Sequence, residues 1–213
     1  MTTHHERLWA LVHTERSALA DDLAEVDDAQ WRARSLCSDW TVEDVVAHLV
    51  AGASLGRWAW LRSMVGAGLD PDRHNARRLA EHRGSTPAET LARFRAVTAS
   101  TVAPSRDVGA WLGEVVVHGE DVRRPLGLVG GPSVESAVEV AQFFVTKDAA
   151  VDSRSVARGL ELVATDSPFR HGDGPVVRGT TLALVMAMAG RAAFLDELDG
   201  AGVELMGDRT RAA

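Results

Sequence analysis

Glu114 and His118 lie in the stretch GEVVVHGEDVRRPLG, with three valines between them. A spacing of four residues on a helix places both side chains on the same face. A carboxylate and an imidazole held in this way are suited to binding a metal ion, but they are also a common surface pair that contributes only about 0.2–0.5 kcal/mol. Because a carboxylate buried among valines needs a partner or a metal ion, the apolar context favours a role inside the protein.

A third candidate, His48, lies in the apolar stretch TVEDVVAHLV. A lone histidine in such a helix is more often a core residue than a metal ligand. However, two antiparallel helices of one bundle can turn His48 toward Glu114 and His118. Two imidazoles and one carboxylate leave open coordination positions on a metal such as zinc, which is typical of catalytic sites. From residue types and spacing alone, a metal triad and three unrelated polar positions remain equal alternatives.

Polar residues near these candidates have less specific interpretations. Asp44, one turn before His48, either orients the imidazole or caps its own helix, and the second interpretation is favoured. Cys37 is interpreted as a small buried hydrophobe rather than a nucleophile. Arg123 and Arg124 follow His118 closely. They either bind a substrate carboxylate through paired hydrogen bonds or stabilise the carboxyl end of their helix.

Helical periodicity accounts for most of the first 150 residues. The sequence predicts five helices, with capping residues at several of their starts. The stretch GLDPDRHNARRLAEHRG is interpreted as a loop with a short helix. The predicted helices are a first from about Glu6 to Glu25, a second from Thr41 to Val65, a third after Thr86, a fourth from about Asp107 to Arg124 and a fifth after Ser133.

The pattern changes after about Asp152. RGLELVATD alternates as a strand does, GDGPVVRG indicates a turn and a strand, TTLALVMAMAGRAAFLDELDG indicates a helix, and VELMG indicates a last short strand. The predicted fold is therefore mainly helical, with residues 1–150 forming an up-and-down helical bundle that carries the metal site. Residues 151–213 form a small α/β domain.

The composition excludes several classes of protein. The chain of 213 residues has a formal net charge of -7, so it lacks the general basic surface that nucleic acid requires. Cys37 is the only cysteine, which indicates a reducing compartment. No signal peptide and no apolar run long enough for a membrane span are found, so a cytoplasmic protein is expected. A single lysine and the absence of isoleucine are typical of a GC-rich bacterial genome.

CSDWTVEDVVAHL, followed by GEVVVHGEDVRRPLG, resembles the mycothiol-dependent maleylpyruvate isomerase family, a branch of the DinB-like four-helix metalloproteins. The stretches RGLELVATD, GDGPVVRG and MAGRAAFLDELDGAGVEL are similar to the small C-terminal domain of that family, itself similar to sterol carrier proteins. The resemblance implies that His48, Glu114 and His118 bind zinc or another divalent metal. It also implies that mycothiol, a thiol made by actinobacteria, is the cosubstrate.

The expected function is that of a zinc-dependent mycothiol S-transferase or thiol-dependent cis–trans isomerase acting on a small electrophile. Coordination to zinc deprotonates a thiol, and the thiolate is the nucleophilic form. One alternative is a hydrolase that uses zinc-bound water, with Glu120 or Asp121 as the general base. Another is a binding protein that keeps the metal or only the fold. The sequence leaves the electrophile and the oligomeric state open.

Overall fold

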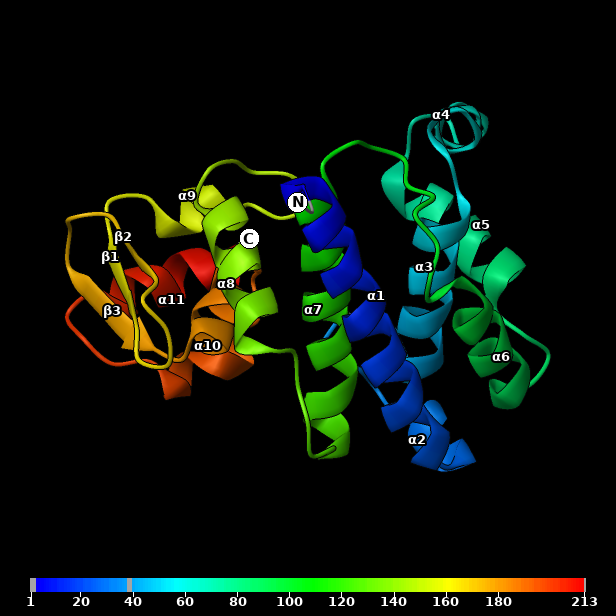
Figure 1. Cartoon of the computed structure of the whole chain (residues 1–213), viewed down its shortest axis with the longest axis horizontal. Coiled ribbons are helices and arrows are strands. Elements are labelled where there is room, and N and C mark those ends of the chain that lie inside the picture. The colour runs from blue at the N-terminus through cyan, green and yellow to red at the C-terminus, as the bar shows by residue number, and fades with distance from the viewer. Residues whose placement is uncertain (1–2, 38–39, 213) are drawn as a thin grey trace. The chain divides into compact units, whose positions relative to one another are not determined.

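The structure is a computed structural model that describes residues 3–37 and 40–212. The chain divides into two compact units, Met1–Gly131 and Pro132–Ala213. The first unit is helical, and the second combines helices with a three-stranded sheet (Figure 1). The prediction of a mainly helical chain with a small α/β unit at its C-terminal end is confirmed. No helix of the described residues is both long and apolar enough to cross a membrane.

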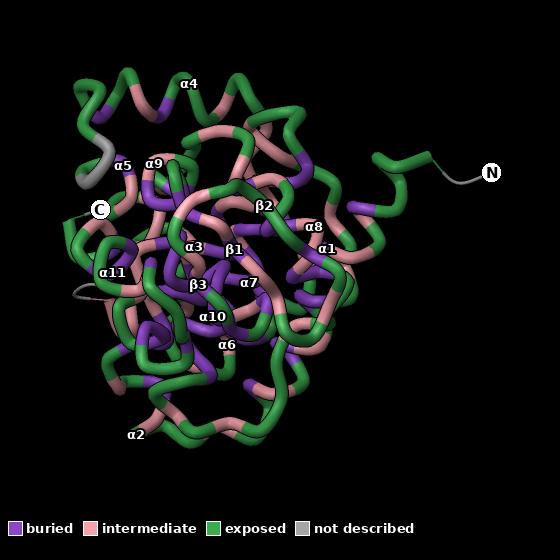
Figure 2. The backbone as a smooth tube through the Cα atoms, turned by 90° about the vertical axis from the view of Figure 1, so that its left-hand side faces the viewer, coloured by how far each residue is buried: buried purple, intermediate pink, exposed green. Residues whose placement is uncertain are grey.

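Four helices of the first unit form a closed bundle, in which each helix packs against two others. The helices α1 and α3 both contact α6 and α7. The helices α3 and α7 carry more buried residues than α1 and α6 do, and Figure 2 colours the backbone by this burial. The four helices are α1 (His4–Asp22), α3 (Val42–Ser54), α6 (Pro87–Val97) and α7 (Val108–Leu126). Two short elements, η1 (Leu23–Glu25) and α2 (Asp28–Trp31), lie between α1 and α3.

The predicted capping residues begin two of these helices. The Thr41 side chain accepts a hydrogen bond from the backbone N–H of Asp44, and the Asp44 side chain accepts one from the backbone N–H of Thr41. Thr86 accepts a hydrogen bond from the backbone N–H of Glu89 at the start of α6, where Pro87 is the first helical residue. Such caps satisfy N–H groups that have no partner inside the helix.

The prediction of one long helix from Thr41 to Val65 is wrong. The chain leaves α3 at Leu55, whose φ of -102° and ψ of 111° are extended, and Gly56 then begins α4 (Arg57–Gly66). The sequence does not reveal this break, because apolar residues continue into α4. That helix exposes them instead of burying them, with Trp58 76% exposed and Val65 63% exposed.

The stretch interpreted mainly as a loop contains a regular helix, α5 (Pro71–His82), which contacts α3 and α4. Proline fits the first position of a helix, and the alanine, arginine and leucine residues that follow have high helix propensity. The polar composition of this stretch therefore reflects a partly exposed helix rather than an irregular connection.

The second unit is built around α10 (Thr181–Met188), whose residues are mostly buried. The helix α8 (Val134–Phe144) packs against α10, so the boundary between the units falls at residues 131 and 132 rather than near residue 150. Strand β1 (Glu161–Ala164) pairs antiparallel with β2 (Arg170–His171) and parallel with β3 (Val176–Gly179). The remaining elements are α9 (Ser153–Ala157), η2 (Ala192–Glu197) and α11 (Val203–Ala212).

The prediction of a last strand at VELMG is wrong, because these residues begin α11. Met206 and Thr210, four residues apart, are both buried on this helix. A five-residue apolar stretch fits either a strand or the start of a helix, and the buried face that continues to Thr210 decides for the helix.

Candidate metal centre

The three sequence-predicted ligands come from the two most buried helices of the bundle. His48 lies on α3, and Glu114 and His118 lie one turn apart on α7, which packs against α3. The valines on either side of these residues are buried and fix both helices in the core. The three side chains keep partial access to solvent, with exposed fractions of 19% for His48, 19% for Glu114 and 12% for His118.

The structure brings these three side chains together. The Nε2 atom of His48 lies 2.5 Å from Oε1 of Glu114, and Nε2 of His118 lies 3.8 Å from the same oxygen. One donor atom from each residue lies within 4.8 Å of the others. The carboxylate of Glu114 therefore lies beside both imidazoles, and three electron-pair donors face one small volume.

A buried carboxylate orients one of the imidazoles. The Nδ1 atom of His118 lies 2.9 Å from Oδ2 of Asp121, whose side chain is fully buried. Because an ionised carboxylate only accepts hydrogen bonds, the proton belongs on Nδ1, and Nε2 of His118 keeps its lone pair for a metal ion. Carboxylates commonly fix metal-binding histidines in this way.

The role of Asp121 was not predicted, although its spacing of three residues from His118 on one helix is the signal that could have revealed it. The prediction that Asp44 caps its helix instead of orienting His48 is confirmed. One oxygen of Asp44 closes the cap with Thr41, and the other accepts a hydrogen bond from Arg83.

Trp40 forms one wall of the site. Its ring centroid lies 4.9 Å from that of His48 and 6.2 Å from that of His118. The imidazoles themselves meet edge to face at 5.0 Å. An indole packed on both rings covers that side of the site and restricts the rotation of the imidazoles.

Arg16, on α1, supplies a positive charge near the Glu114 carboxylate. Burial lowers the pKa of Arg16 to about 10, and the charge of Glu114 acts in the opposite direction. Arg16 remains cationic at neutral pH, and its guanidinium donates a hydrogen bond of 2.9 Å to the carbonyl oxygen of Ser100. The Arg16 cation therefore lies close enough to the Glu114 carboxylate for the two groups to interact electrostatically.

The donor set fits zinc. Two imidazole nitrogens and one carboxylate oxygen are ligands that zinc accepts, and three protein ligands leave a position for another molecule. A second group of possible ligands, Cys37, His118 and Asp121, also has its donor atoms within 4.8 Å. The Asp121 carboxylate in that group is fully buried and already bound to His118, so the first group is the better metal site.

Arg123 and Arg124 do not join this cluster; the sequence left substrate binding and stabilisation of the helix end as alternatives for them. The Arg123 side chain is 3% exposed and donates a hydrogen bond of 2.7 Å to Asp22, with Glu120 at 3.5 Å. Its guanidinium is therefore engaged by carboxylates inside the protein. Arg124 lies on the exposed side of α7.

Comparison with known proteins gives a family for the chain. Residues 12–120 match the family described as the mycothiol maleylpyruvate isomerase N-terminal domain, and this segment includes His48, Glu114 and His118. The chain belongs to this family. The matched segment covers most of the first unit and ends inside α7.

Two solved structures have the same fold. The first is the crystal structure of the mycothiol-dependent maleylpyruvate isomerase, with 21% identity and a TM-score of 0.59. The second is that of a histidine-to-alanine mutant under the same name, with 20% identity and a TM-score of 0.58. Each match covers 94% of this chain and 96% of the other. A comparison with curated proteins finds no match.

Proposed function

We propose that the chain is a zinc- and mycothiol-dependent enzyme that acts on a small electrophile, as a cis–trans isomerase or as an S-transferase. The observation that carries the proposal is the convergence of His48, Glu114 and His118 at a partly exposed point of an otherwise buried pair of helices. A structural zinc site is usually closed by four protein ligands, whereas three ligands and an opening are typical of catalysis.

The side chains of the site have separate roles in this proposal. Bound at the triad, zinc would lower the pKa of a thiol and supply the thiolate that attacks an electrophile. His48, Glu114 and His118 would hold the metal ion. Asp121 keeps the proton of His118 on Nδ1, and Arg16 places a positive charge near Glu114. Trp40 covers one side of the imidazoles.

The thiol and the substrate class rest on the family. The matched family and both similar structures carry the name of the mycothiol maleylpyruvate isomerase. In an isomerase, the bond between sulfur and carbon forms and breaks again after rotation, so the thiol is regenerated. In an S-transferase, the neighbouring carbon takes a proton and the bond between sulfur and carbon persists.

The test is an assay of the full chain loaded with zinc. We expect isomerisation of maleylpyruvate, or a mycothiol conjugate of an added electrophile detected by mass spectrometry, and we expect either product only when mycothiol is present. Turnover without a thiol would indicate a hydrolase instead. A protein that binds zinc but yields neither product would contradict the proposed activity and leave a binding role.

The geometry gives no support to the hydrolase alternative. Asp121 is fully buried and bound to the imidazole nitrogen that faces away from the triad. Glu120 is also buried, where burial raises its pKa, and its nearest charged neighbour is Arg123. Neither carboxylate is placed to take a proton from a water molecule at the triad.

A further inference from the structure

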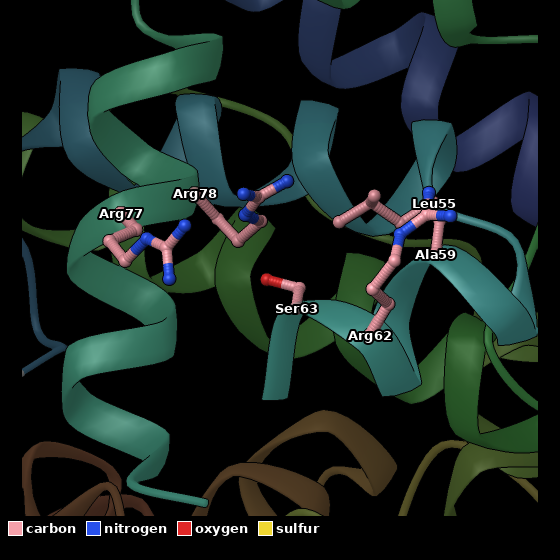
Figure 3. Close-up of a pocket in the computed structure, with 6 residues that line it drawn as sticks. All are labelled: Leu55, Ala59, Arg62, Ser63, Arg77 and Arg78. Carbon is pink, nitrogen blue, oxygen red and sulfur yellow. The ribbon is translucent and has the colours of Figure 1, made fainter. Parts of the chain in front are cut away.

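A pocket of about 280 Å³ lies between α4 and α5, and none of the three metal-ligand candidates lines it. Its residues come from both helices and from the end of α3. Figure 3 shows Arg77 and Arg62 on opposite sides of the pocket, with Ser63 and Arg78 between them. The lining residues are Leu55, Ala59, Arg62, Ser63, Arg77 and Arg78.

The pocket carries an unbalanced positive charge. Arg78 donates a hydrogen bond of 2.5 Å to Glu81 and is neutralised by it. Among the residues that the structure describes, no carboxylate pairs with Arg62 or Arg77. The guanidinium groups of Arg62 and Arg77 therefore face one small volume without a carboxylate, and an anion between them would offset their repulsion.

Arg78 also has a hydrogen-bond donor without an acceptor. The Arg78 side chain is only 14% exposed. Its Nε atom is buried and has no hydrogen-bond partner in the described part of the chain. Buried donors are nearly always satisfied in proteins, and this unsatisfied one belongs to a residue that lines the pocket. This observation is independent of the charge count.

The two walls of the pocket are fixed to each other. Ser63 on α4 and Nδ1 of His74 on α5 form a hydrogen bond of 3.0 Å, and both residues are buried. The ring centroid of Trp60 lies 5.9 Å from that of His74. The arginines therefore project from helices that are already joined, and binding an anion does not require the pocket to form first.

We propose that this pocket binds a small organic acid with two separated carboxylates. A guanidinium binds a carboxylate through two parallel hydrogen bonds. The two unpaired guanidiniums come from opposite walls, so two separated charges suit them better than one compact anion such as phosphate. The volume of about 280 Å³ lies just below the range of about 300–1,000 Å³ for ligand pockets, so only a small molecule would fit. The proposal does not involve mycothiol.

The test is calorimetric titration of the full chain with succinate, with neutral dimethyl succinate and inorganic phosphate as comparisons. We expect saturable binding of succinate at one site, weaker binding of phosphate and no binding of the diester. Arg77→Ala and Arg62→Ala should each weaken succinate binding by about tenfold, since each removes a charged hydrogen-bond partner. Using one variant from each helix guards against a local folding defect in either.

Two controls decide the origin of the binding. Arg73→Ala removes the same charge from an exposed position of α5 that does not line the pocket, and it should leave succinate affinity unchanged. Glu114→Gln should also retain it, because a carboxylate bound at the metal centre would be lost in this variant. Equal weakening by Arg73→Ala and Arg77→Ala, loss of binding in Glu114→Gln, or no binding of succinate would each overturn the proposal. None of these results depends on the thiol reaction.

Discussion

The metal centre and the pocket between α4 and α5 are opposite in what they gather. At the metal centre, electron-pair donors from α3 and α7 face one another, and the fully buried Asp121 backs one of them. At the pocket, N–H donors and positive charges from α4 and α5 face one another. Groups that attract a cation and groups that attract an anion have thus been collected at two places in one unit.

The two regions also differ in how they are held. Buried valines, alanines and leucines surround His48 and Glu114 along α3 and α7, so the three candidate ligands are carried by helices packed in the core of the bundle. Part of the pocket wall belongs to α4, a helix that exposes Trp58, Leu61 and Val65. Changes at the metal centre should therefore act mainly on ligand binding, whereas changes at α4 and α5 should also act on local stability.

The largest expected effect is that of Glu114→Gln on zinc binding. The variant keeps the shape of the side chain but removes the charged oxygen that lies beside both imidazoles. We expect a loss of zinc affinity beyond the roughly 100-fold upper range seen when only an outer partner of a ligand is changed. Competition with a fluorescent chelator measures it, and unchanged affinity would remove Glu114 from the ligand set.

A smaller effect is expected from Asp121→Asn, which should weaken zinc binding by about 10–100-fold because the His118 ring loses its charged partner. The matched control is Asp44→Asn, one turn before His48, where the carboxylate caps α3 and binds Arg83. That change should lower the free energy of unfolding by about 1 kcal/mol and leave zinc affinity intact. Equal effects of both variants on zinc affinity would show that Asp121 has no special role.

The sequence singled out His48, Glu114 and His118 as a candidate triad because each stands out locally, as a polar residue at a helical position between buried apolar ones. The same reasoning assigned Asp44 to its cap. It missed Asp121, because a carboxylate next to the ligands was considered only as a base and not as a hydrogen-bond acceptor. It also missed the break at Leu55, since apolar residues continue along α4 even though that helix exposes them. An apolar pattern in the sequence therefore indicates burial only where the helix packs against other elements of the protein.

The pocket could not be predicted for a different reason. Its arginines belong to two helices, and the second helix was interpreted as mostly loop because its composition is polar. Arg77 and Arg78 alone resemble a solvated basic run, and only their approach to Arg62 and Ser63 gives them a common ligand. A site that depends on the meeting of two ordinary surfaces leaves no local signal in either of them.

A third prediction concerns pH and His74, which joins the two walls of the pocket. Burial lowers the pKa of His74 below its usual value of 6.5, and the charges of Arg78 and Arg77 lower it further. The folded chain therefore keeps His74 neutral where the unfolded chain takes up a proton. The free energy of unfolding should fall as the pH decreases through 6.5, until the pH passes below the folded pKa.

Arg77→Ala should raise the pKa of His74 toward its usual value and reduce this dependence on pH, because one neighbouring positive charge is removed. Arg73→Ala is the control, since Arg73 is not among the groups that shift His74. NMR titration of the imidazole, together with urea unfolding at several pH values, measures both effects. Identical titration curves for His74 in the two variants would show that the pocket arginines do not act on it.

The smallest expected effect tests whether α4 is the weakly held element of the pair. Gly56 begins α4 with an extended backbone (φ -73°, ψ 163°) and provides no side-chain cap, and an added Cβ there would meet nothing within 4 Å. Gly56→Ser should stabilise α4 by a few tenths of a kcal/mol, because a serine hydroxyl can accept a hydrogen bond from the first turn.

Gly127→Ser at the end of α7 should instead lower the free energy of unfolding by about 1 kcal/mol, since Gly127 has a φ of 63°. Urea unfolding measures both, and hydrogen exchange of the α4 amides locates the first. If Gly56→Ser left exchange in α4 unchanged while the cap formed, the stability of the pocket would have to come from α5 and the Ser63–His74 hydrogen bond. In that case α4 would not be the weakly held element.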